Sequence, residues 1–437
     1  MSTSTLAAPV KQADRIILLD SLRGFAILGI LMMNIPGFAQ PSPLYMDPSL
    51  MNELGTINYK IWYFVEWFLA GSQRALFSML FGAGIILFVS RQEKKLQGIE
   101  PAHYFFRRQV WLMVFSTFDV YVLLWFWDIL FDYAALGMIM FIFRNWKPKF
   151  LIIGAAVCLL FMTLRENRDF YEFKNMLQKG ETIAAIDTTK TKLSDKQKEE
   201  LEAYTGAKER NSKEAKSKVI KKQTEATLGS YAELYKLHSD RYVSELVQYL
   251  YFGCWDVLIF MFLGMAFFKL GILTGEASAR TYLIMCVVGL TFGLIMSYSF
   301  LQPWIDAGFN RFVYAKTNGV QYYQLSRVFR SLGIFAFIML LYKSGWFKWL
   351  FAMLRPVGQM AFTNYLMQST ICGLIFYGIG FGLFGKLQRI EIYYVVGAVW
   401  VFQIIFCNVW LRYFLYGPLE WTWRSLTYWK KQPFVKS

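Results

Sequence analysis

The chain has 437 residues, of which 56% are hydrophobic, 19% aromatic and 17% charged. This balance excludes an ordinary soluble globular protein, in which about 25% of residues are charged, and it predicts an all-α integral membrane protein whose first partner is the lipid bilayer. The formal net charge of +16 is explained by basic loops on one face of a membrane, so nucleic acid is not needed as a partner.

Runs of mostly apolar residues recur along the chain, each about 20 residues long and able to cross roughly 30 Å of hydrocarbon as a helix. The first fourteen residues are polar, and the run after them is too long for a cleavable signal, so we expect it to remain as the first span. We predict about ten transmembrane helices, near residues 16–38, 72–90, 106–126, 129–143, 149–164, 250–269, 281–302, 326–342, 357–384 and 391–414.

Glycines interrupt two of the apolar stretches. The run from residue 55 to 90 is too long for one straight span, so we predict an interfacial helix at 59–69 and a span that begins after Gly71. Gly417 and Pro418 stop the tenth span, and an amphipathic helix with Glu420 and Arg424 at i,i+4 spacing should follow.

Basic residues are concentrated in alternate loops. The loops at 91–108, 144–149, 269–280 and 343–355 and the tail at 424–436 are basic, whereas connections such as 40–58 are poor in Lys and Arg. The positive-inside rule then predicts a multi-pass protein of the bacterial inner membrane with both termini in the cytoplasm. The five cysteines lie in or at the ends of apolar runs, which is typical of small buried side chains rather than of disulfides.

One polar segment divides the chain into three parts. Residues 165–242 contain 17 basic and 14 acidic residues, which predicts a soluble helical insert, placed in the periplasm by the expected topology, between membrane regions at 1–164 and 243–437. The insert is either a solvated helical hairpin with i,i+4 Glu and Lys pairs or a cap on which an acceptor docks.

Charges at the expected cytoplasmic end of the first spans are candidates for a substrate site, because ionisable residues in membrane helices are costly. Asp20 and Arg23 share one helix face, either as a structural ion pair or as a site where Arg23 holds an anionic head group. Arg107 and Arg108 either anchor the third span or extend the same phosphate site.

A second group of polar residues lies toward the other end of the spans. Arg74 either snorkels or pairs with Glu66, Asp128 or Asp119 in a cavity that opens outward. The remaining candidates for substrate contacts are Asn34, Gln73, Asn364 and Gln368, of which the last two could equally hydrogen-bond between helices. Asp128 follows two tryptophans and Asp256 lies just inside the sixth span.

Several motifs carry a family resemblance. RIILLDSLRGFAILGILMMNI, SMLFGAG, the Arg107 and Arg108 pair before WDILFDYAALG, then FTNYLMQS and GPLEWTWR resemble the YeiB-like bacterial membrane proteins, grouped as domain of unknown function 418. That family is similar to a wider superfamily of transmembrane acyltransferases, which move acyl groups from cytoplasmic acyl-CoA to sugars or envelope glycans. The resemblance covers both ends of the chain and most spans but leaves out the insert.

The resemblance also shows what this chain lacks. An essential histidine on the first span of many acyltransferases falls on Asn34 here, and a second histidine of YeiB-like proteins falls on Asp119. The two histidines of the chain, His103 and His238, lie in a loop and in the insert, where we expect an interfacial and a solvated side chain. Any catalytic base must then be a carboxylate such as Asp119 or Asp128.

Two functions follow as expectations. The first is transfer of an acyl group from acyl-CoA, as a substrate, to an envelope sugar or lipid, and the second is a non-catalytic transporter or binding protein for a small anionic or lipid-like molecule. No Walker loop, dinucleotide fingerprint or metal-binding motif is present in the sequence, so we expect neither a metal nor a covalently bound cofactor. The sequence does not indicate an oligomeric state.

Overall fold

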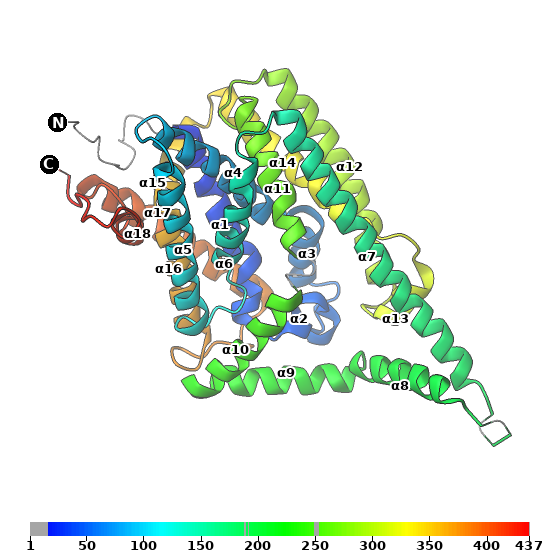
Figure 1. The fold of residues 1–437 in the computed structure, drawn as a ribbon. Coiled ribbons are helices and arrows are strands. Elements are labelled where there is room, and N and C mark those ends of the chain that lie inside the picture. Colours follow the sequence, from blue (N-terminus) through cyan, green and yellow to red (C-terminus); the bar gives the residue numbers. More distant parts are fainter. Residues whose placement is uncertain (1–15, 188, 191, 249–252, 437) are drawn as a thin grey trace.

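The computed structural model describes residues 16–187, 189–190, 192–248 and 253–436, and Figure 1 shows that they form a bundle of helices. The first half contains α1 (Ile17–Ala39), α2 (Ser42–Met46), a short 3-10 helix (Pro48–Met51), α3 (Ile57–Phe64), a π-helical turn (Val65–Leu69), α4 (Ser72–Glu93), α5 (Glu100–Tyr121), α6 (Leu130–Met140), a second 3-10 helix (Phe141–Phe143) and α7 (Pro148–Ala184).

The second half contains α8 (Asp195–Arg210), α9 (Lys213–Leu228), α10 (Tyr231–Gln248), α11 (Cys254–Lys269), α12 (Ala279–Asp306), α13 (Arg311–Thr317), α14 (Tyr323–Ser344), α15 (Lys348–Gln359), α16 (Ala361–Phe376), α17 (Arg389–Tyr413) and α18 (Pro418–Tyr428). All five cysteines are free thiols. The all-α prediction is confirmed for the described residues, in which β structure is limited to one bridge between Phe414 and Val435.

Six segments of the described chain are long and apolar enough to cross a membrane, at Ile17–Ala39, Ile57–Glu93, Pro148–Ala184, Ala279–Asp306, Tyr323–Ser344 and Arg389–Tyr413. These helices make the chain a multi-pass membrane protein. The other four expected spans correspond to α5, α6, α11 and α16, and residues 250–252 of one of them lie outside the described residues. A count of ten therefore stays a prediction.

Helix α1 lies at the centre of the bundle. It packs against α4, α15, α16 and α17, while α11 lies between α4 and α7, and α12 pairs with α14. Close approach of α15 to α1 depends on Gly358, since a Cβ atom there would overlap the backbone carbonyl oxygen of Asp20. The packing brings α15 against the turn of α1 that carries Asp20.

The predicted break at Gly71 is confirmed. The π-helical turn ends at Leu69, and Gly71 has a φ of +75°, a left-handed conformation that favours glycine. Arg330 of α14 satisfies the carbonyl groups freed by the break, because its guanidinium donates to Trp67 O at 2.8 Å and to Ala70 O. A buried cation thus stabilises the interruption between α3 and α4.

Two boundaries differ from the sequence prediction. Helix α7 does not end at residue 164 but continues to Ala184, since no proline interrupts the helix-forming residues that follow. Residues 343–355, expected to form a loop, include most of α15, whose apolar residues Phe351 and Leu354 are buried. In each case a polar or basic composition accompanies a helix rather than a loop.

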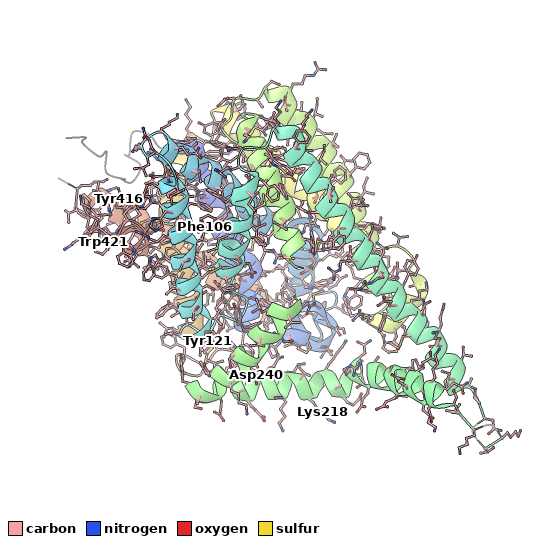
Figure 2. All side chains as sticks on the ribbon, in the orientation of Figure 1. Phe106, Tyr121, Lys218, Asp240, Tyr416 and Trp421 are labelled. Carbon is pink, nitrogen blue, oxygen red and sulfur yellow. The ribbon has the colours of Figure 1, made fainter. Side chains whose placement is uncertain are left out.

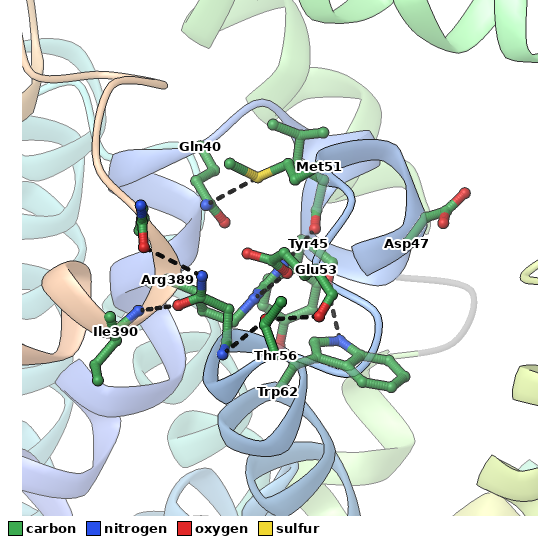
Figure 3. A network of polar contacts seen from close by, with 12 residues as sticks. Gln40, Tyr45, Asp47, Met51, Glu53, Thr56, Trp62, Arg389 and Ile390 are labelled. Carbon is green, nitrogen blue, oxygen red and sulfur yellow. Dashed lines mark hydrogen bonds and ion pairs between the residues drawn. The ribbon is translucent and has the colours of Figure 1, made fainter.

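The loop after α1 is held against the start of α17, as Figure 3 shows. Buried Arg389 donates to Glu53 Oε2 at 2.9 Å, and the Ile390 amide donates to Asn58 Oδ1 at 3.0 Å. Two charges this deeply buried are tolerated because each is paired and hydrogen-bonded. The pair links the loop after α1 to the start of α17, two segments far apart in the sequence.

Helices α8, α9 and α10 cross one end of the bundle in Figure 1. Lys216 forms an ion pair with Asp47 at 2.8 Å, and the Ser42 amide donates to Gln223 at 2.8 Å. On α10, Tyr231 donates to the Tyr121 carbonyl at 3.1 Å, whereas Lys218, labelled in Figure 2, is exposed on α9. The insert is helical as predicted, and it docks on the membrane helices.

Candidate functional site

A cavity of about 250 Å³ lies beside the first turns of α1, and we name it the Arg23 cavity. Its apolar wall includes Phe77, Phe81 and Phe88 of α4. Its charged lining consists of four arginines and two carboxylates, namely Arg23, Arg91, Arg108, Arg424, Asp20 and Glu420. The formal balance of four positive against two negative charges leaves an excess of two positive charges.

Asp20 and Arg23 form the ion pair expected from their spacing. Arg23 Nη1 lies 2.9 Å from Asp20 Oδ1, and the second carboxylate oxygen accepts a hydrogen bond from Gln359 Nε2 at 3.2 Å. The Asp20 side chain is 8% exposed and that of Arg23 is 29% exposed. Asp20 therefore holds the guanidinium at the cavity wall while leaving part of it accessible.

Glu420, the second carboxylate of this lining, caps another helix. Its carboxylate accepts hydrogen bonds from the amides of Phe362 at 2.8 Å and Thr363 at 3.0 Å, at the start of α16. Burial raises the pKa of the Glu420 carboxyl, and the hydrogen bonds from Thr363 oppose that rise. Arg424 stacks on Tyr416, with the guanidinium carbon 4.6 Å from the ring centroid.

The paired arginines of α5 separate, because successive residues of a helix point about 100° apart. Arg108 faces the Arg23 cavity and lies 3.5 Å from the Trp423 ring centroid. Arg107 instead contacts His103 Nε2 at 2.9 Å and the Thr427 carbonyl at 3.3 Å. The structure thus brings only one of these two predicted residues to the cavity.

A second cavity, of about 390 Å³, lies beside the last turns of α1, and we name it the Asn34 cavity. It brings together Asn34, Gln73, Arg74 and Asp128, four of the residues selected from the sequence. It also contains Asp132, next to Asp128 at the turn into the predicted fourth span, and polar residues that were not predicted from the sequence, namely Tyr242, Glu245, Gln324 and Arg327. An arginine inside a predicted span was the available signal for Arg327.

Arg74 pairs with a residue that was not among its predicted partners. Asp256 of α11 receives ion pairs from both Arg74 and Arg327, and Arg327 Nη1 donates to its Oδ2 at 2.9 Å. The expected pairing of Arg74 with Glu66, Asp128 or Asp119 is wrong, because packing of α11 against α4 brings a different carboxylate within reach. One buried aspartate is thus shared by two arginines.

Asp119 and Asp128 are buried next to each other between α5 and α6. Asp128 Oδ2 accepts hydrogen bonds from the Ser116 hydroxyl and from the Leu130 amide at 3.0 Å, so it caps the start of α6. Neither carboxyl has an ion pair among the described residues. Two adjacent buried carboxylates cannot both be charged without a cation, so the pair is suited to holding a proton.

Three other predicted residues lie in contacts between helices. Asn364 donates to the Val357 carbonyl at 3.0 Å, and Gln368 donates to the Ile27 carbonyl at 3.1 Å. Glu66 lies in the π-helical turn, in a small cleft with Arg389. None of the three lines the Arg23 or Asn34 cavity, and the hydrogen bonds of Asn364 and Gln368 fit the interhelical alternative.

The two histidines lie outside both cavities. His103 is exposed beside Arg107, as expected. The expectation that His238 is solvated is wrong, because α10 buries it between Phe126 and Tyr377, where Nδ1 contacts the Leu124 carbonyl. Burial lowers the pKa of His238 to about 4.

The two cavities meet at the first turn of α6. Ile129 and Asp132 line the Asn34 cavity, whereas Leu130 and Tyr133 line the Arg23 cavity. The Tyr133 hydroxyl lies 2.7 Å from that of Ser78 on α4. A single helical turn therefore separates an arginine-rich, partly apolar space from one with both acidic and basic groups.

Comparisons with known proteins agree with the motifs. A family described as a protein of unknown function (DUF418) matches residues 267–430. The chain is 30% identical to the uncharacterized protein YxaH of Bacillus subtilis over 98% of both chains, and 28% identical to the uncharacterized protein YeiB of Escherichia coli over 95% of this chain and 96% of that one. No solved structure matches. The chain therefore belongs to the YeiB-like DUF418 family of uncharacterised bacterial membrane proteins.

Proposed function

We propose that this protein transfers an acyl group from a phosphate-bearing donor, such as cytoplasmic acyl-CoA, to a glycan or lipid acceptor of the cell envelope. The observation that carries the proposal is the pair of cavities that meet at the first turn of α6. The proposal includes the ten-span topology in the inner membrane, with the Arg23 cavity toward the cytoplasm and the Asn34 cavity toward the periplasm.

The Arg23 cavity suits the donor. Its excess of arginines would bind phosphate groups through charge-assisted hydrogen bonds, and Asp20 would orient Arg23 for that contact. The phenylalanines of α4 would receive the apolar part of the donor near Tyr133. Donor phosphates and the acyl end would then occupy different parts of one cavity.

The Asn34 cavity suits the acceptor, with Asp128 as the base. An acceptor hydroxyl or amine attacks the thioester carbonyl, its proton passes to Asp128, and the bond between carbon and sulfur breaks. The proton then passes to the leaving thiolate, so that the products are the acylated acceptor and the free thiol. Asn34, whose amide does not ionise, would hydrogen-bond the acceptor without taking its proton.

Transport or simple binding of an anionic molecule is the second candidate. The observation that favours it is the position of both histidines outside the two cavities, together with a buried carboxyl pair of the kind that carries protons in transporters. Uptake of a labelled substrate without covalent change would support this candidate over acyl transfer.

Calorimetric titration of the purified protein with acetyl-CoA tests the first proposal. Arg23→Gln should weaken binding about ten- to a hundredfold, because a hydrogen bond to a charged group contributes about 1.5–3 kcal/mol. Arg107→Gln is the matched control, since Arg107 faces away from the cavity, and Asn34→Ala should also spare donor binding. Asp128→Asn should abolish transfer of labelled acetyl groups without changing donor affinity. Absence of acetyl-CoA binding by the wild-type protein would leave the second candidate ahead.

A further inference from the structure

We infer that the Asn34 cavity binds a zwitterionic ligand, with its ammonium group on the side of α6 and α10 and its anionic group on the side of α4 and α14. The inference rests on the proposed function only in treating this ligand as the acceptor. Its structural basis is the separation of charges around the cavity wall.

The acidic side of the cavity contains three carboxyl groups. Asp128 precedes α6, Asp132 lies in its first turn, and Glu245 comes from the end of α10, just after the insert. None of the three has an ion pair within the described parts of the chain. Asp132 and Glu245 lie beside the pair of Asp119 and Asp128, and a bound ammonium group would favour the charged forms of both carboxyls.

Aromatic rings lie on the same side. Trp127 and Tyr242 line the cavity next to these carboxyl groups. Ring faces attract an ammonium group, and carboxylates hydrogen-bond it. This side of the wall is therefore suited to a primary amine in its charged form.

The basic side of the cavity contains two arginines. Arg74 and Arg327 share Asp256, so two guanidinium groups meet one carboxylate in these ion pairs. Among the described residues, Arg327 Nε and Gln324 Oε1 have no hydrogen-bond partner, and both side chains are buried, with Arg327 3% and Gln324 8% exposed. Both side chains line the cavity, so a bound group can satisfy them.

Simpler ligands would leave one side of the wall unmatched. An anion would satisfy the arginines but would face Asp132 and Glu245, and a cation would meet the reverse problem. A neutral ligand would compensate neither set of charges. An ammonium group joined by a short linker to a phosphate or carboxylate matches both sides, and a cavity of about 390 Å³ is within the size range of small-molecule sites.

Titration calorimetry in detergent, without an acyl donor, tests this inference. The probes are glycerophosphoethanolamine as the zwitterion, glycerol 3-phosphate as the anion, ethanolamine as the cation and glucose as the neutral control. We expect the zwitterion to bind about tenfold or more tightly than any other probe. Equal or tighter binding of another probe, or no binding of the zwitterion at about 10 mM, would overturn the inference.

Two variants locate the ammonium group. Glu245→Gln and Asp132→Asn should each weaken zwitterion binding about tenfold while leaving glycerol 3-phosphate binding unchanged or tighter. Glu214→Gln, an exposed change on α9, is the matched control. Thermal unfolding of each variant verifies that it is folded, and unchanged zwitterion affinity in folded Glu245→Gln and Asp132→Asn would overturn the assignment.

The zwitterion can come from a lipid or from a free metabolite, and nanodiscs separate the two sources. If the zwitterion is a lipid, the wild-type protein should unfold at a higher temperature in phosphatidylethanolamine nanodiscs than in phosphatidylglycerol nanodiscs. Glu245→Gln should not show this difference. A free source predicts no such difference while glycerophosphoethanolamine still binds. Acetyl-CoA binding is measured separately, so a failure of zwitterion binding and a failure of the acyl-transfer proposal give different results.

Discussion

Two sets of apolar segments have similar hydropathy but differ in burial and in the charged residues they contain. The central set is α1, the α3–α4 segment and α14, and the peripheral set is α7, α12 and α17. In the most apolar windows of α1, the α3–α4 segment and α14, 67%, 61% and 61% of residues are buried, against 22%, 22% and 28% in α7, α12 and α17. The central set carries Asp20, Arg23, Arg74, Arg327 and Arg330. Hydropathy alone therefore does not separate the two sets. The central set carries several charged residues, whereas the buried charge of the peripheral set is Arg389, at the very start of α17 and paired with Glu53.

Removal of Asp256, which Arg74 and Arg327 share, should cause the largest loss of stability. A small loss would contradict the distinction between the two sets of helices. Asp256→Ala leaves Arg327 buried without a carboxylate, so we expect a loss of about 3–5 kcal/mol in the free energy of unfolding. Ile295→Ala, at an exposed position on peripheral α12, is the control and should cost less than about 0.5 kcal/mol. Unfolding in detergent measures both. Equal losses would mean that the buried ions do not distinguish the two sets of helices.

The insert extends the comparison, because His238 is buried against the bundle but carries no charge when folded. Its pKa is lowered from 6.5 to about 4. The contribution of the buried neutral imidazole to the free energy of unfolding is therefore complete above pH 6.5 and is lost as the pH falls from 6.5 to about 4. This difference corresponds to about 3 kcal/mol at most. The protection factors of the α10 amides, which compare observed with intrinsic hydrogen-exchange rates at the same pH, should fall over that range in the wild-type protein.

Two histidine variants check the origin of this pH dependence. His238→Gln should remove the fall in the α10 protection factors between pH 6.5 and 4, whereas His103→Gln, at an exposed position, should retain it. Identical pH profiles for the wild type and His238→Gln would show that another group controls docking of α10.

A smaller loss is expected for the ion pair at the edge of the bundle. Asp20→Ala removes the partner of Arg23, but Arg23 is 29% exposed, so solvent reduces the expected cost to about 1–3 kcal/mol. The double variant Asp20→Ala with Arg23→Leu should lose less stability than Asp20→Ala alone. A double variant that is equally or less stable in thermal unfolding would contradict the pairing.

A test of membrane topology adds to the comparison and does not depend on stability. If α7 crosses the membrane as part of the peripheral layer, a cysteine introduced by Lys218→Cys should react with an impermeant maleimide from outside intact spheroplasts. Lys430→Cys, exposed after α18, should react only after permeabilisation. The reverse pattern would invert the proposed orientation of both cavities.

Local features were predictable, and long-range pairings were not. The break at Gly71 and the ion pair of Asp20 with Arg23 are decided within one or two turns of helix, and both predictions are confirmed. The partner of Arg74 lies 182 residues away in Asp256, and a single sequence carries no record of that distance. Burial of His238 likewise depends on where α10 docks.

The sequence by itself determined the membrane class, the helices and the local groups on each helix face, because hydropathy and helical periodicity are properties of neighbouring residues. It did not determine which face meets which neighbour. Only the tertiary structure decided that Arg108 rather than Arg107 enters the Arg23 cavity, that Arg74 and Arg327 share Asp256, and that Glu245 at the end of α10 reaches the Asn34 cavity. The physical reason is that a buried charge is stabilised by groups from several helices, and packing brings those helices together.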